Sequence, residues 1–168
     1  SFAPRGITGK CFSIEMHHRQ VETAHAGDNI GINVKGLDKL NMPKAGDMIY
    51  LENDPHHKDQ KLAAVKQFDA MVFIQDHPGE LHAAKVDSSG KTTSGGFTPS
   101  IHIRTARAAC RLVKIHWKKG KSTNGAEVKD PLFIKSGDQA LVTMEPKMPI
   151  FMDTYERCPG LGRFAGMD

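Results

Sequence analysis

A carboxylate, an imidazole and a side-chain amide occur within one polar stretch of this chain, between Ser13 and Gly36. Glu15 and His17 lie two positions apart, and alternate side chains of a β-strand share a face, so we expect both on one surface. Asn29 takes an outward position in the next alternating run. Together these groups can accept and donate hydrogen bonds. They predict either a recognition face for a polar ligand or an ordinary solvated hairpin.

Two alternating runs separated by a turn predict the strands that position this face. The turn is expected at Gly27–Asp28, since glycine followed by aspartate is a turn signal. Gly31 leaves a gap in the outer face, where another chain or a ligand could approach closely. The apolar residues expected to point inward are Phe12, Ile14, Met16, Ile30, Ile32 and Val34.

Length and composition predict a globular protein. The 168 residues are 39% hydrophobic, enough to bury the core of one ordinary domain or of two small ones. No apolar run approaches the roughly 20 residues that cross a bilayer, and the first residues lack the apolar centre of a secretory signal. We therefore expect a cytoplasmic protein without a membrane partner. The three cysteines form no C-x-x-C pair, so neither a disulfide framework nor a zinc site is indicated.

Positive charge is concentrated in one part of the chain, although the net charge of +4 is modest. Such a cluster fits a nucleic-acid phosphate backbone, whose binding is mainly sequence-independent and sensitive to salt. A solvated basic face is the alternative. The clustered residues are Arg104, Arg107, Arg111, Lys114, Lys118, Lys119 and Lys121.

Frequent turn residues and short apolar runs predict an all-β fold, a sandwich or barrel. Gly-Asp occurs three times, at Gly27–Asp28, Gly46–Asp47 and Gly137–Asp138, and a strand is expected after each. The polar segment 53–66 is expected to link two small β units. In the second unit, strands are predicted at 68–74, 101–104, 110–117, 139–144 and 150–155.

The sequence contains no recognisable catalytic or metal-binding constellation. Adjacent histidines on a strand point to opposite faces, so His17–His18 and His56–His57 are poor metal clamps. Gly90–Thr92 imitates the end of a phosphate-binding P-loop, but Lys85 stands where the pattern requires glycine. A surface loop between strands is the better interpretation of 87–96. We therefore assign no catalytic residue, no metal ligand and no cofactor ligand.

The motifs resemble those of the elongation factor 1-alpha family. Glu15–His18 followed by Gly27–Lys35 is similar to the family's second domain. Landmarks similar to its third domain follow at His77–Gly79, Ala108–Cys110, Ile134–Asp138 and Leu161–Ala165. Departures from ordinary elongation factor 1-alpha at Gly36–Lys39, Asn41–Pro43 and Ile115–Lys118 favour the divergent elongation factor-like proteins of some algae and protists.

This resemblance implies a translational GTPase that delivers aminoacyl-tRNA to the ribosomal A site. Its full-length parent is expected to use GTP and Mg²⁺ in a separate domain and to work with the ribosome and a guanine nucleotide exchange factor. This chain holds neither an intact P-loop nor an N-K-x-D motif, so no bound cofactor is expected in it, and its own status as an enzyme is left open. The alternative is a β-barrel protein-interaction module without tRNA binding.

The resemblance also implies an organisation and a set of tRNA-binding residues. Residues 1–52 are expected to be part of the second β-barrel, 53–66 a linker, and 67–168 the third β-barrel without its last strands. Glu15 matches the residue that packs on the terminal adenosine, Asn29 lines the amino-acid pocket, and His18 lies near the ester. The residues assigned to tRNA are Glu15, His17, His18, Asn29, Arg104 and Lys147. Lys147 departs from the family pattern, because Met148 separates it from the proline.

Overall fold

The computed structural model describes residues 1–52, 64–89 and 92–167, which belong to two compact units, 1–63 and 64–168. In the described residues, every regular element is a β-strand except the single 3-10 turn η2 (Lys121–Thr123). The predicted all-β fold is therefore confirmed. The predicted linker, 53–66, lies mostly outside the described residues, and the assignment of the units to particular barrels stays a prediction.

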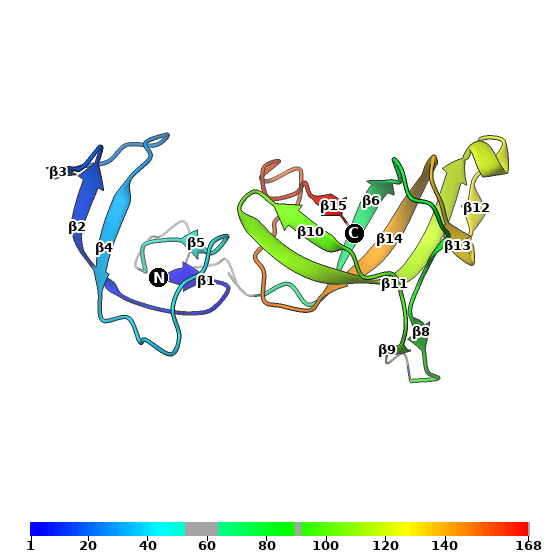
Figure 1. Cartoon of the computed structure of the whole chain (residues 1–168), viewed down its shortest axis with the longest axis horizontal. Helices are drawn as coiled ribbons and strands as arrows, with labels where there is room; N and C mark the ends of the chain where they lie inside the picture. The colour runs from blue at the N-terminus through cyan, green and yellow to red at the C-terminus, as the bar shows by residue number, and fades with distance from the viewer. Residues whose placement is uncertain (53–63, 90–91, 168) are drawn as a thin grey trace. The chain divides into compact units, whose positions relative to one another are not determined.

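The first unit contains two small antiparallel sheets (Figure 1). Three strands form one sheet in the order β3-β2-β4, with bounds Lys10–Met16 for β2, Arg19–Val21 for β3 and Gly31–Lys35 for β4. The second sheet pairs β1 (Phe2–Ala3) with β5 (Met48–Ile49). Among residues 1–52, the buried apolar side chains are those of Phe2, Ala3 and Ile7.

An ion pair between Arg5 and Asp47 stabilises the two-stranded sheet of β1 and β5. The Arg5 guanidinium Nε donates to both carboxylate oxygens of Asp47, at 3.1 and 3.0 Å, and the Asp47 side chain is only 4% exposed. Beside it, the backbone groups of Ser1 and Tyr50 exchange hydrogen bonds of 2.8 and 3.0 Å. Residues far apart in sequence are thus held together by charge-assisted and backbone hydrogen bonds, which offset the small apolar core.

The prediction that Phe12 points inward is wrong. The ladder between β2 and β4 pairs Cys11 with Val34 and Ser13 with Asn33, which leaves Phe12 as an extra residue in a β-bulge. A bulge breaks the two-residue alternation of a strand and redirects the side chain. Phe12 is consequently 62% exposed. Beyond the bulge, Ile14 pairs with Ile32 as predicted, although Ile32 remains 37% exposed.

The second unit is built on one curled six-stranded sheet. Its main path is β15-β10-β11-β14-β6, and β12 pairs with the far end of β11. Figure 1 shows β11 curving along most of the unit. The bounds are Phe68–Phe73 for β6, Ser100–Ile103 for β10, Ala106–Gly120 for β11, Val128–Lys129 for β12, Asp138–Pro146 for β14 and Ala165–Met167 for β15.

Two short strand pairs accompany this sheet. The first joins β7 (Leu81–His82) to β13 (Phe133–Ile134), and the second joins β8 (Lys85–Val86) to β9 (Thr92–Ser94). The β8–β9 hairpin contains the stretch that imitates a P-loop, and residues 90–91 of that stretch lie outside the described residues.

The core of the second unit lies under β10, β11 and β14. Its most deeply buried members include Ile101, Cys110, Ala140 and Val142, each at most 1% exposed. Along β11 the ladder contains two irregularities, which leave Val113 and His116 as extra residues. Strict alternation from Leu112 would bury Lys114 and His116. The first bulge instead buries Ile115 and exposes Lys114, which avoids an unpaired charge in the core, and the second restores the original alternation.

All three Gly-Asp turns are present, and each is followed by the expected strand, β4, β5 or β14. The glycines adopt φ values of 99°, 94° and 85°, a region that favours glycine because it lacks a Cβ. In each turn the aspartate carboxylate accepts a hydrogen bond from the backbone N–H three residues earlier, at 2.8, 2.9 and 3.1 Å. The same short sequence therefore builds the same turn three times.

The strand predicted at 150–155 is absent, and the described structure has a loop there. Ile150 and Phe151 are both buried, so consecutive side chains do not alternate between core and solvent. After them the chain turns, with the Cys158 N–H donating to the Thr154 carbonyl oxygen at 3.0 Å. The other four strands predicted for this unit are confirmed, with β11 and β14 longer than expected.

Lys118 and Asp138 form a buried ion pair whose loss should destabilise the second unit. Their side chains are 9% and 1% exposed, and Nζ lies 3.5 Å from Oδ2. Lys118→Met would leave a buried carboxylate with only its hydrogen bonds from Ser122 and the Lys135 N–H. We expect a loss of roughly 3–5 kcal/mol in the free energy of unfolding, measured by urea titration with Trp117 fluorescence.

Lys119→Met is the matched control, because Lys119 is the exposed neighbour on the same strand. It should change the free energy of unfolding by less than about 0.5 kcal/mol. Equal effects of the two substitutions would contradict the structural role of the ion pair.

Burial should make Cys110 unreactive, while Cys11 is exposed. Burial raises the pKa of the Cys110 thiol to about 12, against the weaker lowering effect of Lys147, so the reactive thiolate is scarce even at pH 9. In native protein, a thiol reagent should modify Cys11 rapidly and Cys110 only after denaturation. Peptide mapping by mass spectrometry measures both rates, and similar native rates would contradict the buried environment.

Candidate nucleic-acid interface

The polar face of the first unit is built by the pairing of β2 with β4. Glu15 lies opposite Gly31 and Ser13 opposite Asn33, so these four residues share one surface. The Glu15 side chain is exposed, and its other neighbour is Gln20 of β3. A Cβ at Gly31 would lie 3.9 Å from the Glu15 carbonyl oxygen, an ordinary contact distance. Packing therefore does not demand glycine there, and the gap in the face is open surface.

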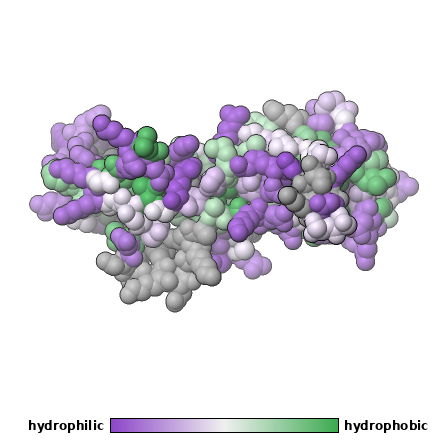
Figure 2. Space-filling view, turned by 90° about the horizontal axis from the view of Figure 1, so that it is seen from below, coloured by the Kyte–Doolittle hydropathy of each residue, from purple (hydrophilic) through white to green (hydrophobic). Residues whose placement is uncertain are grey.

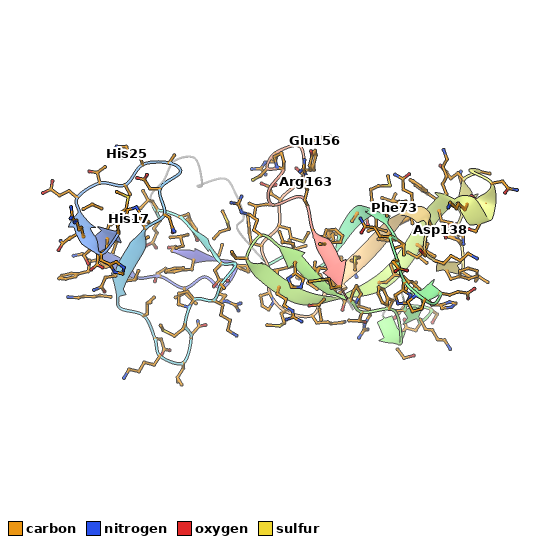
Figure 3. All side chains as sticks on the ribbon, turned by 45° about the horizontal axis from the view of Figure 1, so that its top comes forward. His17, His25, Phe73, Asp138, Glu156 and Arg163 are labelled. Atoms are coloured by element: carbon orange, nitrogen blue, oxygen red, sulfur yellow. The ribbon has the colours of Figure 1, made fainter. Side chains whose placement is uncertain are left out.

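His17 and His18 form the turn between β2 and β3, with φ values of 50° and 63°. The expectation that they occupy opposite faces of a strand is therefore wrong. Met16 pairs with Arg19, which leaves the two histidines as a two-residue hairpin turn, and positive φ at both central positions is the pattern of a type I′ turn. Both imidazoles are exposed at the end of β2, where Figure 3 labels His17.

Asn29 lies at the same end of this sheet. The turn at His25–Asp28 fixes the approach of the chain to β4, because the Asp28 N–H donates to the His25 carbonyl oxygen at 3.1 Å. Asn29 follows this turn directly and is exposed, two residues before the Gly31 that faces Glu15. The fold thus brings four of the six predicted residues together. They are Glu15, His17, His18 and Asn29.

Basic side chains accompany these residues in the first unit. Figure 2 shows another face of this unit, at the left, which is mostly hydrophilic with smaller hydrophobic areas between. The unit's exposed basic side chains include Lys10, Arg19 and Lys35. An exposed carboxylate with basic neighbours can accept a hydrogen bond from a hydroxyl or amino group while the cations meet phosphate oxygens.

The basic cluster of the second unit is largely an exposed face of β11. Arg107, Lys114 and Lys119 are exposed, and Arg111 is half-buried. Arg107 donates to the Ser100 hydroxyl at 2.9 Å, and the Lys114 ammonium lies 3.7 Å from an Asp130 carboxylate oxygen. Lys118 does not belong to this face, because it is buried against Asp138 with its ammonium 4.2 Å from the centre of the Phe133 ring.

Arg104 occupies the turn that joins β10 to β11, with φ of 52°. It is exposed, but its guanidinium packs against the loop before β15. A Cβ at Gly160 would lie only 2.6 Å from Arg104 Nη1, so glycine provides the space for this contact. Arg104 therefore has a structural contact within its own unit beside any role toward a ligand.

Lys147 follows β14 and is anchored at both ends. Its backbone N–H donates to the Ala109 carbonyl oxygen at 2.9 Å, and its ammonium donates to the Glu145 carboxylate. That hydrogen bond lowers the pKa of Glu145, helped by the charges of Lys147 and Arg111 and by a hydrogen bond from Gln67, while burial opposes it. Part of the positive charge of Lys147 is thus already neutralised.

The loop before β15 contains a contact between Arg163 and Tyr155 that the sequence did not predict. The Arg163 guanidinium lies 4.8 Å from the centre of the Tyr155 ring and also donates to the Tyr155 hydroxyl. Figure 3 labels Arg163 and Glu156 on this loop. A Cβ at Gly162 would lie 2.4 Å from the Tyr155 backbone, so the loop closes tightly on itself. Arg163 belongs to one of the motifs that resemble the family, but no motif in the sequence indicates that it would contact Tyr155, eight residues earlier.

A histidine of β11, a threonine of β14 and an aspartate of β6 lie close together, with His116 Nε2 3.7 Å from Asp69 Oδ1. His116 Nε2 is 2.7 Å from Thr143 Oγ1, and the Thr143 hydroxyl donates to Asp69 Oδ1 at 2.6 Å. In a catalytic triad the histidine accepts the proton of the hydroxyl. Here that proton is directed to the carboxylate, so the arrangement does not activate Thr143 as a nucleophile.

No group of three or more His, Cys, Asp or Glu side chains within residues 1–52, 64–89 and 92–167 could hold a metal ion. Across the same residues, no helix is long and apolar enough to span a membrane.

Residues 67–168 match the family described as GTP-eEF1A C-terminal domain-like. The whole chain is 35% identical to elongation factor 1-alpha of Archaeoglobus fulgidus and to that of Tetrahymena pyriformis, in each case over 167 residues, or 99% of the chain. The chain spans only about a third of these relatives, 35% and 34% of their lengths.

The fold is similar to that of Sup35 in crystal structures of its complexes with GMPPNP and with GDP. In both, the TM-score is 0.75 at 21% identity, over 99% of this chain and 36% of the Sup35 chain. That likeness concerns the fold alone and agrees with the two β units described above. By its sequence match over residues 67–168, the chain belongs to the GTP-eEF1A C-terminal domain-like family.

Proposed function

We propose that this chain forms the tRNA-binding part of a translation elongation factor that delivers aminoacyl-tRNA to the ribosomal A site. The observation that carries the proposal is the gathering of Glu15, His17, His18 and Asn29 at one end of an exposed polar sheet. These groups suit the acceptor end of a tRNA, which presents a base, a ribose hydroxyl and an ester rather than phosphate alone.

The charge of Glu15 restricts what it can bind. A carboxylate is repelled by a phosphodiester, but it accepts hydrogen bonds from a 2′-hydroxyl or from a base amino group. The exposed His17–His18 turn and Asn29 supply donors and acceptors beside it. The terminal adenosine at Glu15 and the attached amino acid near Asn29 and His18 therefore form a chemically consistent arrangement.

The cations on the outer face of β11, of which Arg111 is half-buried, suit the phosphate backbone of the tRNA stem. Arg107, Arg111, Lys114 and Lys119 follow one strand, as a backbone-tracking surface requires. Lys147 and Arg104 contribute less to this surface in our proposal, because they lie outside the strand, after β14 and in the turn before β11.

Hydrolysis of GTP belongs to a part of the elongation factor outside this chain. Lys85 stands where a P-loop needs glycine, so the residues here do not fit a guanine nucleotide. In this proposal the complete protein binds GTP with Mg²⁺, which stabilises the charge that develops on the phosphates. It works in the cytoplasm with the ribosome and a guanine nucleotide exchange factor.

Glu15→Ala in the full-length protein should weaken binding of aminoacyl-tRNA in the GTP state. Loss of a hydrogen bond to a charged group is expected to raise the Kd roughly 10- to 100-fold, and Asn29→Ala should have a smaller effect. Filter binding measures both. Glu22→Ala, which removes an exposed carboxylate just beyond β3, is the matched control. Unchanged affinity of the Glu15 and Asn29 variants would refute the site.

The basic face of β11 should set the salt dependence of binding. Arg107→Gln and Lys119→Gln are each expected to reduce the slope of log K against log salt by about 0.7–0.9, because one phosphate contact is lost. Lys39→Gln, at an exposed position of the first unit, should leave the slope unchanged. Salt-insensitive binding to a protein partner, with no affinity for RNA, would favour the interaction-module alternative instead.

A further inference from the structure

Phe12 is an aromatic side chain that the backbone holds in solvent. The β-bulge between Cys11 and Ser13 takes it out of the inward alternation, and the residue remains 62% exposed. Exposure of so large a ring loses the free energy that its burial would contribute. The exposure is also local, since its strand neighbours Ile14 and Met16 are half-buried.

A lysine holds the ring at the polar face. The Lys35 ammonium lies 3.3 Å from the centre of the Phe12 ring, in a cation–π contact. Lys35 shares its face of β4 with Asn33 and Gly31, and Gly31 lies opposite Glu15. The ring therefore lies beside the same surface as the proposed adenosine site. With one face covered by the ammonium, its exposed area falls on the edge and the other face.

A second observation points to an anionic ligand at this place. Lys10 lies directly opposite Lys35 in the ladder, and like charges opposite one another destabilise a sheet. Within the described residues, no carboxylate forms an ion pair with either lysine. A phosphate held between the two ammonium groups would relieve this repulsion.

We infer that Phe12, Lys10 and Lys35 form a binding site for an unpaired nucleotide, with the base stacked on Phe12 and its phosphate between the two lysines. This inference rests on the proposed function and extends it. Phe12 precedes Glu15 by three residues, about 10 Å along the strand, so the ring is within reach of a nucleotide adjacent to the terminal adenosine. Aromatic stacking accepts any base.

The test compares Phe12→Leu and Phe12→Trp in the full-length protein bound to aminoacyl-tRNA in the GTP state. Leucine keeps an apolar side chain but cannot stack, and should raise the Kd roughly 5- to 100-fold. Tryptophan keeps the stacking surface and should bind like the wild type. Leu40→Ala, at a 96% exposed apolar residue of the same unit, is the matched control. Its Kd should not change.

A double-mutant cycle identifies the nucleotide. Each unpaired nucleotide before the terminal adenosine is replaced in turn by an abasic residue. At one position, the abasic substitution should raise the Kd of the wild-type protein by the same factor as Phe12→Leu does. With that abasic tRNA, Phe12→Leu should cause no further loss of affinity. Lys10→Gln and Lys35→Gln should lower the salt dependence, which Phe12→Leu should leave unchanged.

The inference and the proposed function fail in different ways. Wild-type affinity of Phe12→Leu, together with weakened binding by Glu15→Ala, would overturn the stacking site and leave the proposed function standing. Equal losses for Phe12→Leu and Phe12→Trp would also overturn the stacking site. Absence of tRNA binding by the wild-type protein in the GTP state would overturn both.

Discussion

The side-chain parity of a β-strand is the constraint on which most of this structure depends. Successive residues face opposite sides of the sheet, so one inserted residue reverses the face of every residue that follows. In the first unit a single bulge places Phe12 in solvent and leaves Ile14 against Ile32. In the second unit a pair of bulges changes the parity and then restores it. Lys114 therefore faces solvent, while Lys118 reaches the interior.

The restored parity explains why the second unit contains a buried ion pair. Once Lys118 is directed inward, its charge requires a partner, and Asp138 of the neighbouring strand supplies it. Asp138 also belongs to the Gly-Asp turn that begins β14, where it accepts the Lys135 N–H. One carboxylate therefore fixes a turn and neutralises a buried cation. Two elements far apart in sequence depend on it.

Sequence reasoning succeeded where local chemistry determines local structure. The three Gly-Asp turns depend on a glycine with positive φ and a nearby carboxylate, and both requirements are visible in the sequence. It failed where the direction of a side chain or the position of a turn depends on the register with a partner strand. The bulge at Phe12 exists because of the register between β2 and β4, and the His17–His18 turn because β3 pairs with β2. Consecutive burial at Ile150 and Phe151 likewise reflects packing rather than pattern.

The grouping of Glu15 with Asn29 was predictable from alternation and family resemblance. The contacts of Arg104 with Gly160 and of Lys147 with Glu145 were not, because they depend on the folding of distant or looped segments. Hydrogen exchange of the full-length protein, with and without aminoacyl-tRNA in the GTP state, is the most direct test of whether these surfaces bind tRNA. We expect slower exchange on binding in peptides covering 10–20 and 29–35, and in the exposed part of β11. Slower exchange confined to other segments, with 10–35 unchanged, would contradict it.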